Sequence, residues 1–314
     1  MKSILPHLLA KKTRQRIYKT SRPRFWLYTT GPFILGIWWS EILWTVSFGN
    51  LPVIQTVTIV CVILAWLFYF LFPANLRIYG LNDIADGDTD KRNPKKTDYE
   101  QAVTETAIKP LLALILLTTL GTVGVVWWIL WIWDVGYTIA YKELLMMLGL
   151  LLLSSAIYSL PPIRAKAKPF FDGITNVLYI IPWVIGFLLF GWTLQSVLWL
   201  WFLAWWCWSI AMHTYSAIPD IEPDEAAWLL TTAVLLWKKW TLLYCLLMRT
   251  VAALLAILAL PHLIRFFLAC FMVYATMIMR SWYGSVFSLY KKFPLINGLI
   301  WFILFWLLVL LQMF

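Results

Sequence analysis

Three aspartates at the end of an apolar stretch have a spacing that could hold a metal ion. Asp83, Asp86 and Asp90 follow one another at intervals of three and four residues, so a continuous helix places them within about 60° on one face. Such carboxylates repel one another unless a cation lies between them. Oxygen ligands without a nearby His or Cys favour Mg²⁺ over zinc. The other interpretation is an acidic helix end in water, stabilised by Lys91 to Lys96.

The same helical face carries polar and aromatic residues on the side that leads into the apolar stretch. Asn75, Tyr79 and Asn82 continue the stripe of the aspartates, whereas Arg77 and Asp88 point elsewhere. We expect these three residues to contact a substrate held beside the acidic cluster.

A second acidic cluster follows a later apolar stretch. Asp220 and Asp224 share a helical face, and Glu222 points away if the segment is helical. Pro219 and Pro223 can interrupt a helix, so Glu222 remains a possible ligand. Mg²⁺ typically binds one or two carboxylates together with substrate phosphates. Two clusters therefore predict two or more Mg²⁺ ions and a diphosphate substrate whose departing charge they stabilise.

A basic segment lies between the two clusters in the sequence. It begins at Tyr158, a further candidate for substrate contact, reaches Pro169 and includes Arg164, Lys166 and Lys168. As topology alone it is an ordinary positively charged loop. Beside acidic metal clusters, its Arg and Lys side chains would neutralise diphosphate oxygens that the metal does not reach.

Three further ionisable residues lie within or near apolar stretches. His213 shares a face with Asp220 and could accept a proton, although a hydrogen-bonded packing role is the ordinary one for such a histidine. Arg249 and Glu41 lie inside apolar stretches and are functional candidates for that reason alone. We assign them no role from the sequence.

The composition places these clusters in an integral membrane protein. The chain of 314 residues is 62% hydrophobic and only 13% charged, against about a quarter charged in soluble proteins. Its net charge of +10 does not indicate nucleic-acid binding, because basic residues form short clusters between apolar runs. We expect a basic N-terminal arm over 1–24 and one membrane domain over 25–314. Nine membrane-spanning helices are predicted: 25–46, 52–76, 107–133, 142–159, 174–192, 196–218, 240–261, 264–280 and 294–313.

The distribution of basic residues predicts the orientation. With the N-terminus inside, only Lys142 and Arg265 of the 25 Lys and Arg fall on the outer side, and Arg249 lies within a span. We expect a multi-pass protein of the cell (inner) membrane, with its active site in the cytoplasm and its C-terminus outside. A cation-coupled transporter is the rival class, but it would place its polar groups near the midplane rather than at span ends on one face.

Four strings of the sequence resemble one enzyme family. They are SRPRFWLY (Ser21 to Tyr28), PANLRIYGLNDIADGDTDKRNPKK (Pro73 to Lys96), YSLPPIRAKAKPFFD (Tyr158 to Asp172) and HTYSAIPDIEPDEAA (His213 to Ala227). Together with the nine predicted spans they resemble the UbiA superfamily of intramembrane prenyltransferases, most closely its lycopene elongases of C50 carotenoid synthesis. The resemblance implies an all-helical bundle and Mg²⁺-dependent transfer of an isoprenyl group, dimethylallyl in this branch, to a lipophilic acceptor such as lycopene.

The resemblance also implies roles for individual residues. Metal binding falls to Asp83, Asp86, Asp90, Asp220 and Asp224. Contacts with the diphosphate fall to Asn82, Arg164 and Lys168, and also to Lys166 and Lys91. Other members of the superfamily use a quinone precursor, haem, chlorophyllide or a lipid as acceptor, and the sequence does not exclude these acceptors.

Overall fold

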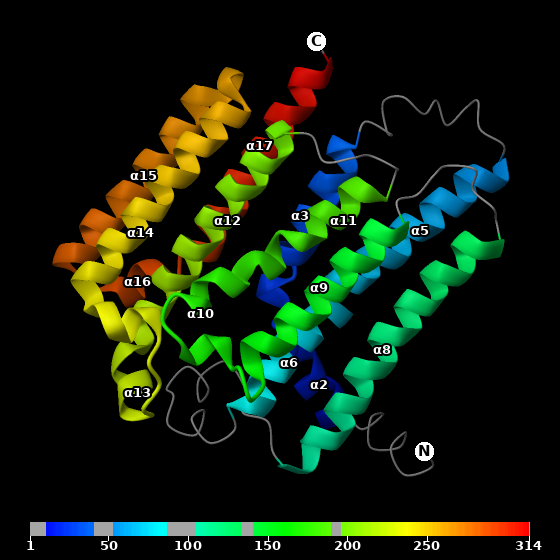
Figure 1. The fold of residues 1–314 in the computed structure, drawn as a ribbon, viewed down its shortest axis with the longest axis horizontal. Helices are drawn as coiled ribbons and strands as arrows, with labels where there is room; N and C mark the ends of the chain where they lie inside the picture. The colour runs from blue at the N-terminus through cyan, green and yellow to red at the C-terminus, as the bar shows by residue number, and fades with distance from the viewer. Residues whose placement is uncertain (1–10, 41–52, 87–104, 133–140, 190–195, 314) are drawn as a thin grey trace. The chain divides into compact units, whose positions relative to one another are not determined.

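The computed structural model describes residues 11–40, 53–86, 105–132, 141–189 and 196–313, and every regular element among them is a helix (Figure 1). Contacts divide the chain into two compact units, Met1–Pro161 with Ile181–Trp192, and Pro162–Ile180 with Thr193–Phe314. The expectation of one membrane domain over 25–314 stays a prediction.

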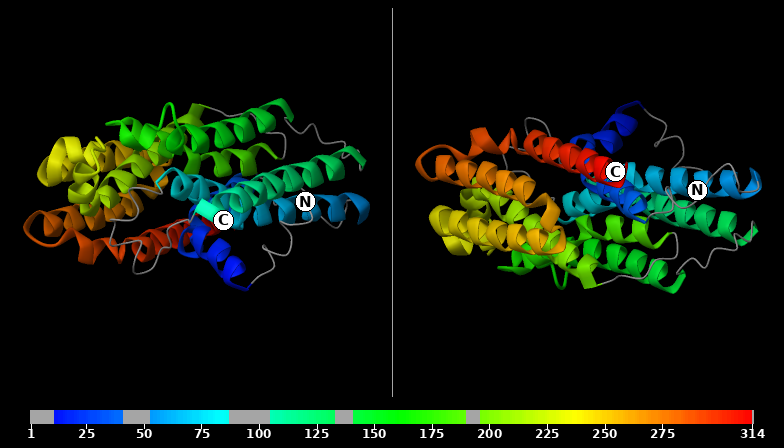
Figure 2. Two further views of the ribbon diagram at one scale, coloured as in Figure 1. Left: turned by 90° about the horizontal axis from the view of Figure 1, so that it is seen from below. Right: turned by 90° about the horizontal axis from the view of Figure 1, so that it is seen from above.

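The first unit begins with a short amphipathic helix, which is followed by more apolar helices. Its helices are α2 (Lys11–Thr20), α3 (Leu27–Trp39), α5 (Val53–Leu71), α6 (Pro73–Ala85), α8 (Glu105–Ile132), α9 (Tyr141–Ser159) and α11 (Ile181–Leu188). Helix α11 lies against α3, and α5 lies against α8, as the views of Figures 1 and 2 agree.

The second unit contains four long helices and three short ones. They are α10 (Phe171–Ile174), α12 (Ser196–Ala217), α13 (Ile221–Ala226), α14 (Thr232–Ala259), α15 (Ile264–Tyr283), α16 (Val286–Tyr290) and α17 (Phe293–Met313). Helix α14 packs along both α12 and α15, and Figure 2 shows α14 and α15 (yellow and orange) side by side.

Six helices of the described residues are long and apolar enough to cross a membrane. Each of the nine predicted spans overlaps a described helical segment, but α3 is shorter than a full span and the tryptophan-rich α12 is not among the six. The count of nine crossings therefore stays a prediction. The multi-pass membrane character follows from the six apolar helices.

The predicted second span is longer than expected and is not continuous. The backbone departs from helical geometry at Phe72, and Pro73 begins α6 at the first helical position, where its missing N–H costs least. Helix α6 then carries the chain to Ala85, well beyond the predicted end at residue 76. A buried cluster fixes α6 against α8: Leu76, Leu81, Leu111 and Ile115.

Two glycines bring α3 and α11 into direct backbone contact. A Cβ at Gly36 would collide with the carbonyl oxygen of Trp183, and a Cβ at Gly186 would collide with that of Phe33. Small residues allow this close approach between helices in membranes, where apolar side chains gain little by leaving lipid. The two helices are thus joined at a point where neither tolerates a side chain.

Candidate active site: two acidic clusters and a basic segment

The first acidic cluster lies at the end of α6, where Asp83 is buried and paired with an arginine. Asp83 is 2% exposed, and its Oδ1 accepts a hydrogen bond of 2.9 Å from Nη2 of Arg22. Asp86 follows at the end of the helix, where its N–H donates to the carbonyl oxygen of Asn82. Asp90 and Lys91 lie outside the described residues. That Asp90 shares a helical face with Asp83 and Asp86 therefore stays a prediction.

Arg22 reaches Asp83 because the chain before α3 makes a tight, unusual turn. The φ of Arg22 is 50°, in the left-handed region. This region is disfavoured for a residue other than glycine, especially before a proline such as Pro23. The indole N–H of Trp26 donates back to the carbonyl oxygen of Ser21 at 3.1 Å and closes the turn. The Arg22 guanidinium also lies 4.7 Å from the centre of the Tyr79 ring, a cation–π contact.

Arg22 is a candidate site residue to which the sequence assigned no role. The string SRPRFWLY pointed to this segment, but nothing local links Arg22 to an aspartate 61 positions away. Its guanidinium places a compensating positive charge beside a carboxylate whose burial would otherwise be costly.

Tyr79 and Asn75 lie on the predicted stripe but have different surroundings. Tyr79 is buried and packs against Phe25, with ring centres 5.7 Å apart. The side-chain nitrogen of Asn75 donates to the carbonyl oxygen of Phe70 at 2.6 Å and to the hydroxyl of Thr29 at 2.7 Å. Asn75 therefore joins α6 to α5 across the break at Phe72 and also joins α6 to α3. Its expected substrate contact stays a prediction.

The opposite side of α6 is occupied as the sequence predicts. Arg77 points away from the aspartates and donates to the hydroxyl of Ser155 and to the carbonyl oxygen of Leu152, each at 3.0 Å. These bonds connect α6 to α9. Tyr158, expected to contact substrate, lies on α9 and is half-buried.

The second acidic cluster occupies a bent helical segment of the second unit. Helix α12 ends at Ala217, a 3₁₀ turn covers Ile218–Asp220, and α13 begins at Ile221. Asp220 and Asp224 are partly buried whereas Glu222 is exposed. That the two aspartates share a helical face stays a prediction. His213 is partly buried in the last turns of α12, and its carbonyl oxygen accepts a hydrogen bond from the Ser216 hydroxyl.

The backbone of the basic segment contains two residues with positive φ. Arg164 has φ 43° and precedes the 3₁₀ turn Ala165–Ala167, and Phe170 has φ 67°. Arg164 and Lys166 are partly buried, whereas Lys168 is exposed. All three predicted diphosphate contacts of this segment thus come from one irregular loop of the second unit.

A buried aspartate anchors this loop to the start of α14. Asp172 is 1% exposed, and its carboxylate accepts the backbone N–H of Thr232 and that of Gly173, each at 2.8 Å, and also the Thr232 hydroxyl. The Thr232 hydroxyl oxygen in turn accepts the N–H of Phe170 at 2.6 Å. Asp172 therefore holds the loop that carries Arg164 and Lys168.

The donor chemistry of the first cluster fits Mg²⁺. Among the described residues, which do not include Asp90, no three His, Cys, Asp or Glu side chains are grouped so as to hold a metal ion. Asp83 and Asp86 nevertheless offer oxygen ligands only, and the buried Asp83 carboxylate already has a cation against it. Hard oxygen ligands of this kind suit Mg²⁺.

Comparison with known proteins decides the family. The model of the UbiA prenyltransferase family matches residues 37–286. The chain belongs to the UbiA prenyltransferase family. Like the family, it is a prenyltransferase.

Individual members of the UbiA family agree with this assignment. The chain is 35% identical to a lycopene elongase/hydratase from Haloarcula japonica, over 76% of this chain and 72% of that protein. A UbiA homologue from Archaeoglobus fulgidus bound to GPP and Mg²⁺ has a similar fold, with TM-score 0.64, 18% identity and coverage of 91% of this chain and 96% of that one. The same homologue bound to DMAPP and Mg²⁺ matches over the same shares, with TM-score 0.62 and 15% identity.

Proposed function

We propose that this UbiA-family enzyme transfers dimethylallyl groups from dimethylallyl diphosphate to lycopene. The observation that carries the proposal is the buried Asp83 carboxylate at the end of α6, which is paired with the Arg22 guanidinium. The named activity of the Haloarcula japonica relative supports lycopene as the acceptor. The Archaeoglobus fulgidus homologue with DMAPP and Mg²⁺ supports the donor and the metal.

The aspartates of both clusters serve as the metal ligands in this proposal. Asp83, Asp86 and Asp90 hold Mg²⁺ in the first cluster, and Asp220 and Asp224 hold it in the second, so that two or more ions are used. Bound Mg²⁺ would stabilise the negative charge that develops on the departing diphosphate.

Basic and amide side chains bind the remaining diphosphate oxygens. Arg164 and Lys168 neutralise them from the basic segment, assisted by Lys166, and Asn82 and Lys91 do so from the first cluster. Arginine can donate two parallel hydrogen bonds to a phosphate, whereas lysine acts as a point charge. Together they orient the diphosphate and help it to leave.

The transfer itself breaks one carbon–oxygen bond and forms one carbon–carbon bond. The bond between the allylic carbon and the diphosphate oxygen breaks, and its electron pair leaves with pyrophosphate. The allylic cation then alkylates a double bond at the end of lycopene, which leaves a tertiary cation. That cation either loses a proton, for which His213 is the candidate acceptor, or adds water and releases a proton.

The protein must protect the allylic cation from water before it reacts. Apolar and aromatic side chains do this by excluding solvent, and their ring faces stabilise a cation by about 0.5–2 kcal/mol each. Tyr79, buried on α6 one turn before Asp83, is the candidate for this role. The reaction takes place at the cytoplasmic face of the cell membrane, with the C-terminus outside.

Expression in cells that accumulate lycopene tests the proposal. The wild-type chain is expected to convert lycopene into products with one or two added five-carbon units, with or without added water, as measured by mass spectrometry of the pigments. An Asp83→Asn variant at the same expression level is expected to leave lycopene unchanged. Unaltered pigment with the wild-type chain, together with prenylation of a quinone precursor, would contradict the choice of acceptor.

A further inference from the structure

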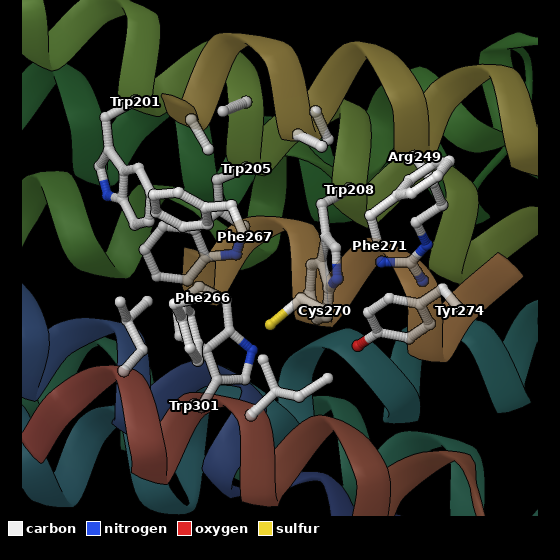
Figure 3. Close-up of a pocket in the computed structure, with 16 residues that line it drawn as sticks. Trp201, Trp205, Trp208, Arg249, Phe266, Phe267, Cys270, Phe271, Tyr274 and Trp301 are labelled. Atoms are coloured by element: carbon white, nitrogen blue, oxygen red, sulfur yellow. The ribbon is translucent and has the colours of Figure 1, made fainter. Parts of the chain in front are cut away.

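The second unit contains a pocket that the proposed chemistry does not use. This aromatic pocket lies between α12, α14, α15 and α17 and holds about 580 Å³ of space, including its open mouth (Figure 3). Aromatic rings from α12, α15 and α17 form its walls, among them Trp201, Trp205, Phe267 and Trp301. Ala253 and Ala256 of α14 form one side.

A buried arginine closes one end of the aromatic pocket. Arg249 is 5% exposed, and its guanidinium lies 3.8 Å from the ring centre of Tyr274 and 5.0 Å from that of Trp208. The Tyr274 hydroxyl donates to Asn297. Arg249 and Tyr274 also border a smaller cavity of about 210 Å³ that reaches Tyr215. They therefore form a partition across the interior of the unit.

The walls of the aromatic pocket favour one class of ligand. Besides the Arg249 guanidinium, the Tyr274 hydroxyl, the Cys270 thiol and the indoles of four tryptophans, the lining side chains are hydrocarbon. The walls therefore offer few partners for a sugar, nucleotide or peptide, whose polar groups would be buried at a cost. The ring faces offer offset stacking to a flat, conjugated chain. A rigid polyene also loses less conformational freedom on entry than a flexible saturated chain does.

We propose that the aromatic pocket binds one segment of a linear conjugated polyene, with the partition of Arg249 and Tyr274 limiting how far the chain enters. This inference rests on the proposed function, because it gives the polyene acceptor a second point of attachment on the enzyme. Burial of hydrocarbon in the pocket would supply affinity for the acceptor, because apolar surface leaves water or detergent for a closely fitting site. The diphosphate site would then not need to contribute to the affinity for the acceptor.

Two substitutions and a control on the neighbouring residue test the proposal. Ala253→Leu and Ala253→Trp enlarge a side chain that lines the pocket, and the leucine adds the smaller volume. Leu254 follows on the same helix but does not line the pocket, and its side chain is 58% exposed, because one residue turns an α-helix by about 100°. Leu254→Trp is therefore the control for the effect of a new tryptophan in this part of α14.

The measurement is binding of lycopene to purified protein in detergent, without a prenyl donor. A chiral site induces circular dichroism in the visible bands of lycopene, whereas lycopene dissolved in micelles has none. We expect this signal with the wild type and with Leu254→Trp, a reduced signal with Ala253→Leu and an affinity lower by about tenfold or more with Ala253→Trp. Equal signals in all four proteins, or none in the wild type, would overturn the proposal.

A competition experiment distinguishes the polyene from the acyl chain of a membrane lipid. Perhydrolycopene has the same carbon skeleton without double bonds and is expected to displace lycopene poorly. Displacement as effective as that by lycopene itself would show a general hydrocarbon crevice and overturn the proposal.

The outcome is separable from that of the proposed function. If the wild type prenylates lycopene in cells and Ala253→Trp does so equally well with equal binding, the pocket assignment is wrong and the activity stands. If the wild type binds lycopene with an Ala253-dependent signal but transfers no prenyl group, the pocket assignment stands and the activity is wrong.

Discussion

The guanidinium of Arg22 and the carboxylate of Asp83 form an ion pair that joins the turn before α3 to the end of α6. The two atoms Nη2 and Oδ1 are 2.9 Å apart, and both side chains are largely shielded from solvent. A buried carboxylate is costly without a compensating charge. The pair also holds Arg22 in a backbone conformation that its residue type disfavours.

Replacement of Arg22 by methionine is expected to make the protein depend on Mg²⁺ for its stability. Removing one partner of a buried pair costs about 3–5 kcal/mol, and a divalent cation at Asp83 would replace the missing charge. Thermal unfolding in detergent should show a lower Tm for Arg22→Met without Mg²⁺ and a larger gain on adding Mg²⁺ than the wild type shows. Arg14→Met, on the exposed face of α2, is the control. An equal gain in Tm on adding Mg²⁺ in all three proteins would show that Arg22 does not lie at the metal site.

Loss of either acidic cluster is expected to abolish cleavage of the donor. Asp83→Asn and Asp220→Asn remove a negative ligand while keeping the side-chain shape, and each should slow pyrophosphate release from dimethylallyl diphosphate by about 100-fold or more. Glu222→Gln is the matched control, because Glu222 is exposed. A Glu222→Gln variant as slow as Asp220→Asn would make Glu222 a ligand after all.

Removal of the Arg164 guanidinium is expected to weaken binding of the diphosphate. Arg164→Gln should raise KM for dimethylallyl diphosphate by about tenfold or more, the loss expected for one or two charge-assisted hydrogen bonds. Steady-state kinetics at saturating Mg²⁺ measure the change. Lys239→Gln, an exposed cation on α14, should leave KM unaltered. An unchanged KM in Arg164→Gln would remove this residue from the site.

Asp172 is expected to act on stability and not on metal binding. Asp172→Ala leaves the N–H groups of Thr232 and Gly173 without their acceptor, at about 1–3 kcal/mol for each buried donor. We expect a lower Tm and poorer expression than with Asp172→Asn, which retains one acceptor oxygen. The Mg²⁺ concentration for half-maximal activity should be unchanged in the protein that folds. A shift in that concentration would instead indicate a role for Asp172 as a ligand.

The contact between α3 and α11 is expected to tolerate no side chain. Gly36→Ala places a Cβ against backbone atoms of Trp183, so the two helices must separate and lose packing. Gly31→Ala, on the same helix with no neighbouring atoms within 4 Å, should lower Tm less, although the following Pro32 disfavours a helical residue that carries a Cβ. Thermal unfolding in detergent compares the two. Equal Tm values would show that the helices can move apart at little cost.

The local patterns of the sequence account for the helices and for the candidate site residues other than Arg22. Each predicted span overlaps a described helix because apolar length is a property of contiguous residues. The break at Phe72 was not predicted, and the helix reaches Ala85 although the membrane span was predicted to end at residue 76. Polar residues after residue 76 look like a span end, but packing of Leu76 and Leu81 against α8 keeps the chain helical.

The sequence alone determined the membrane class, the positions of the two acidic clusters and the basic segment, and the family resemblance, since all of these lie in composition and short spacing. The tertiary structure decided which charges are buried and what they touch. Arg22 with Asp83 and Asp172 with Thr232 are pairs separated by 61 and 60 residues. Helical periodicity relates only residues a few turns apart, so these contacts depend on how the helices pack.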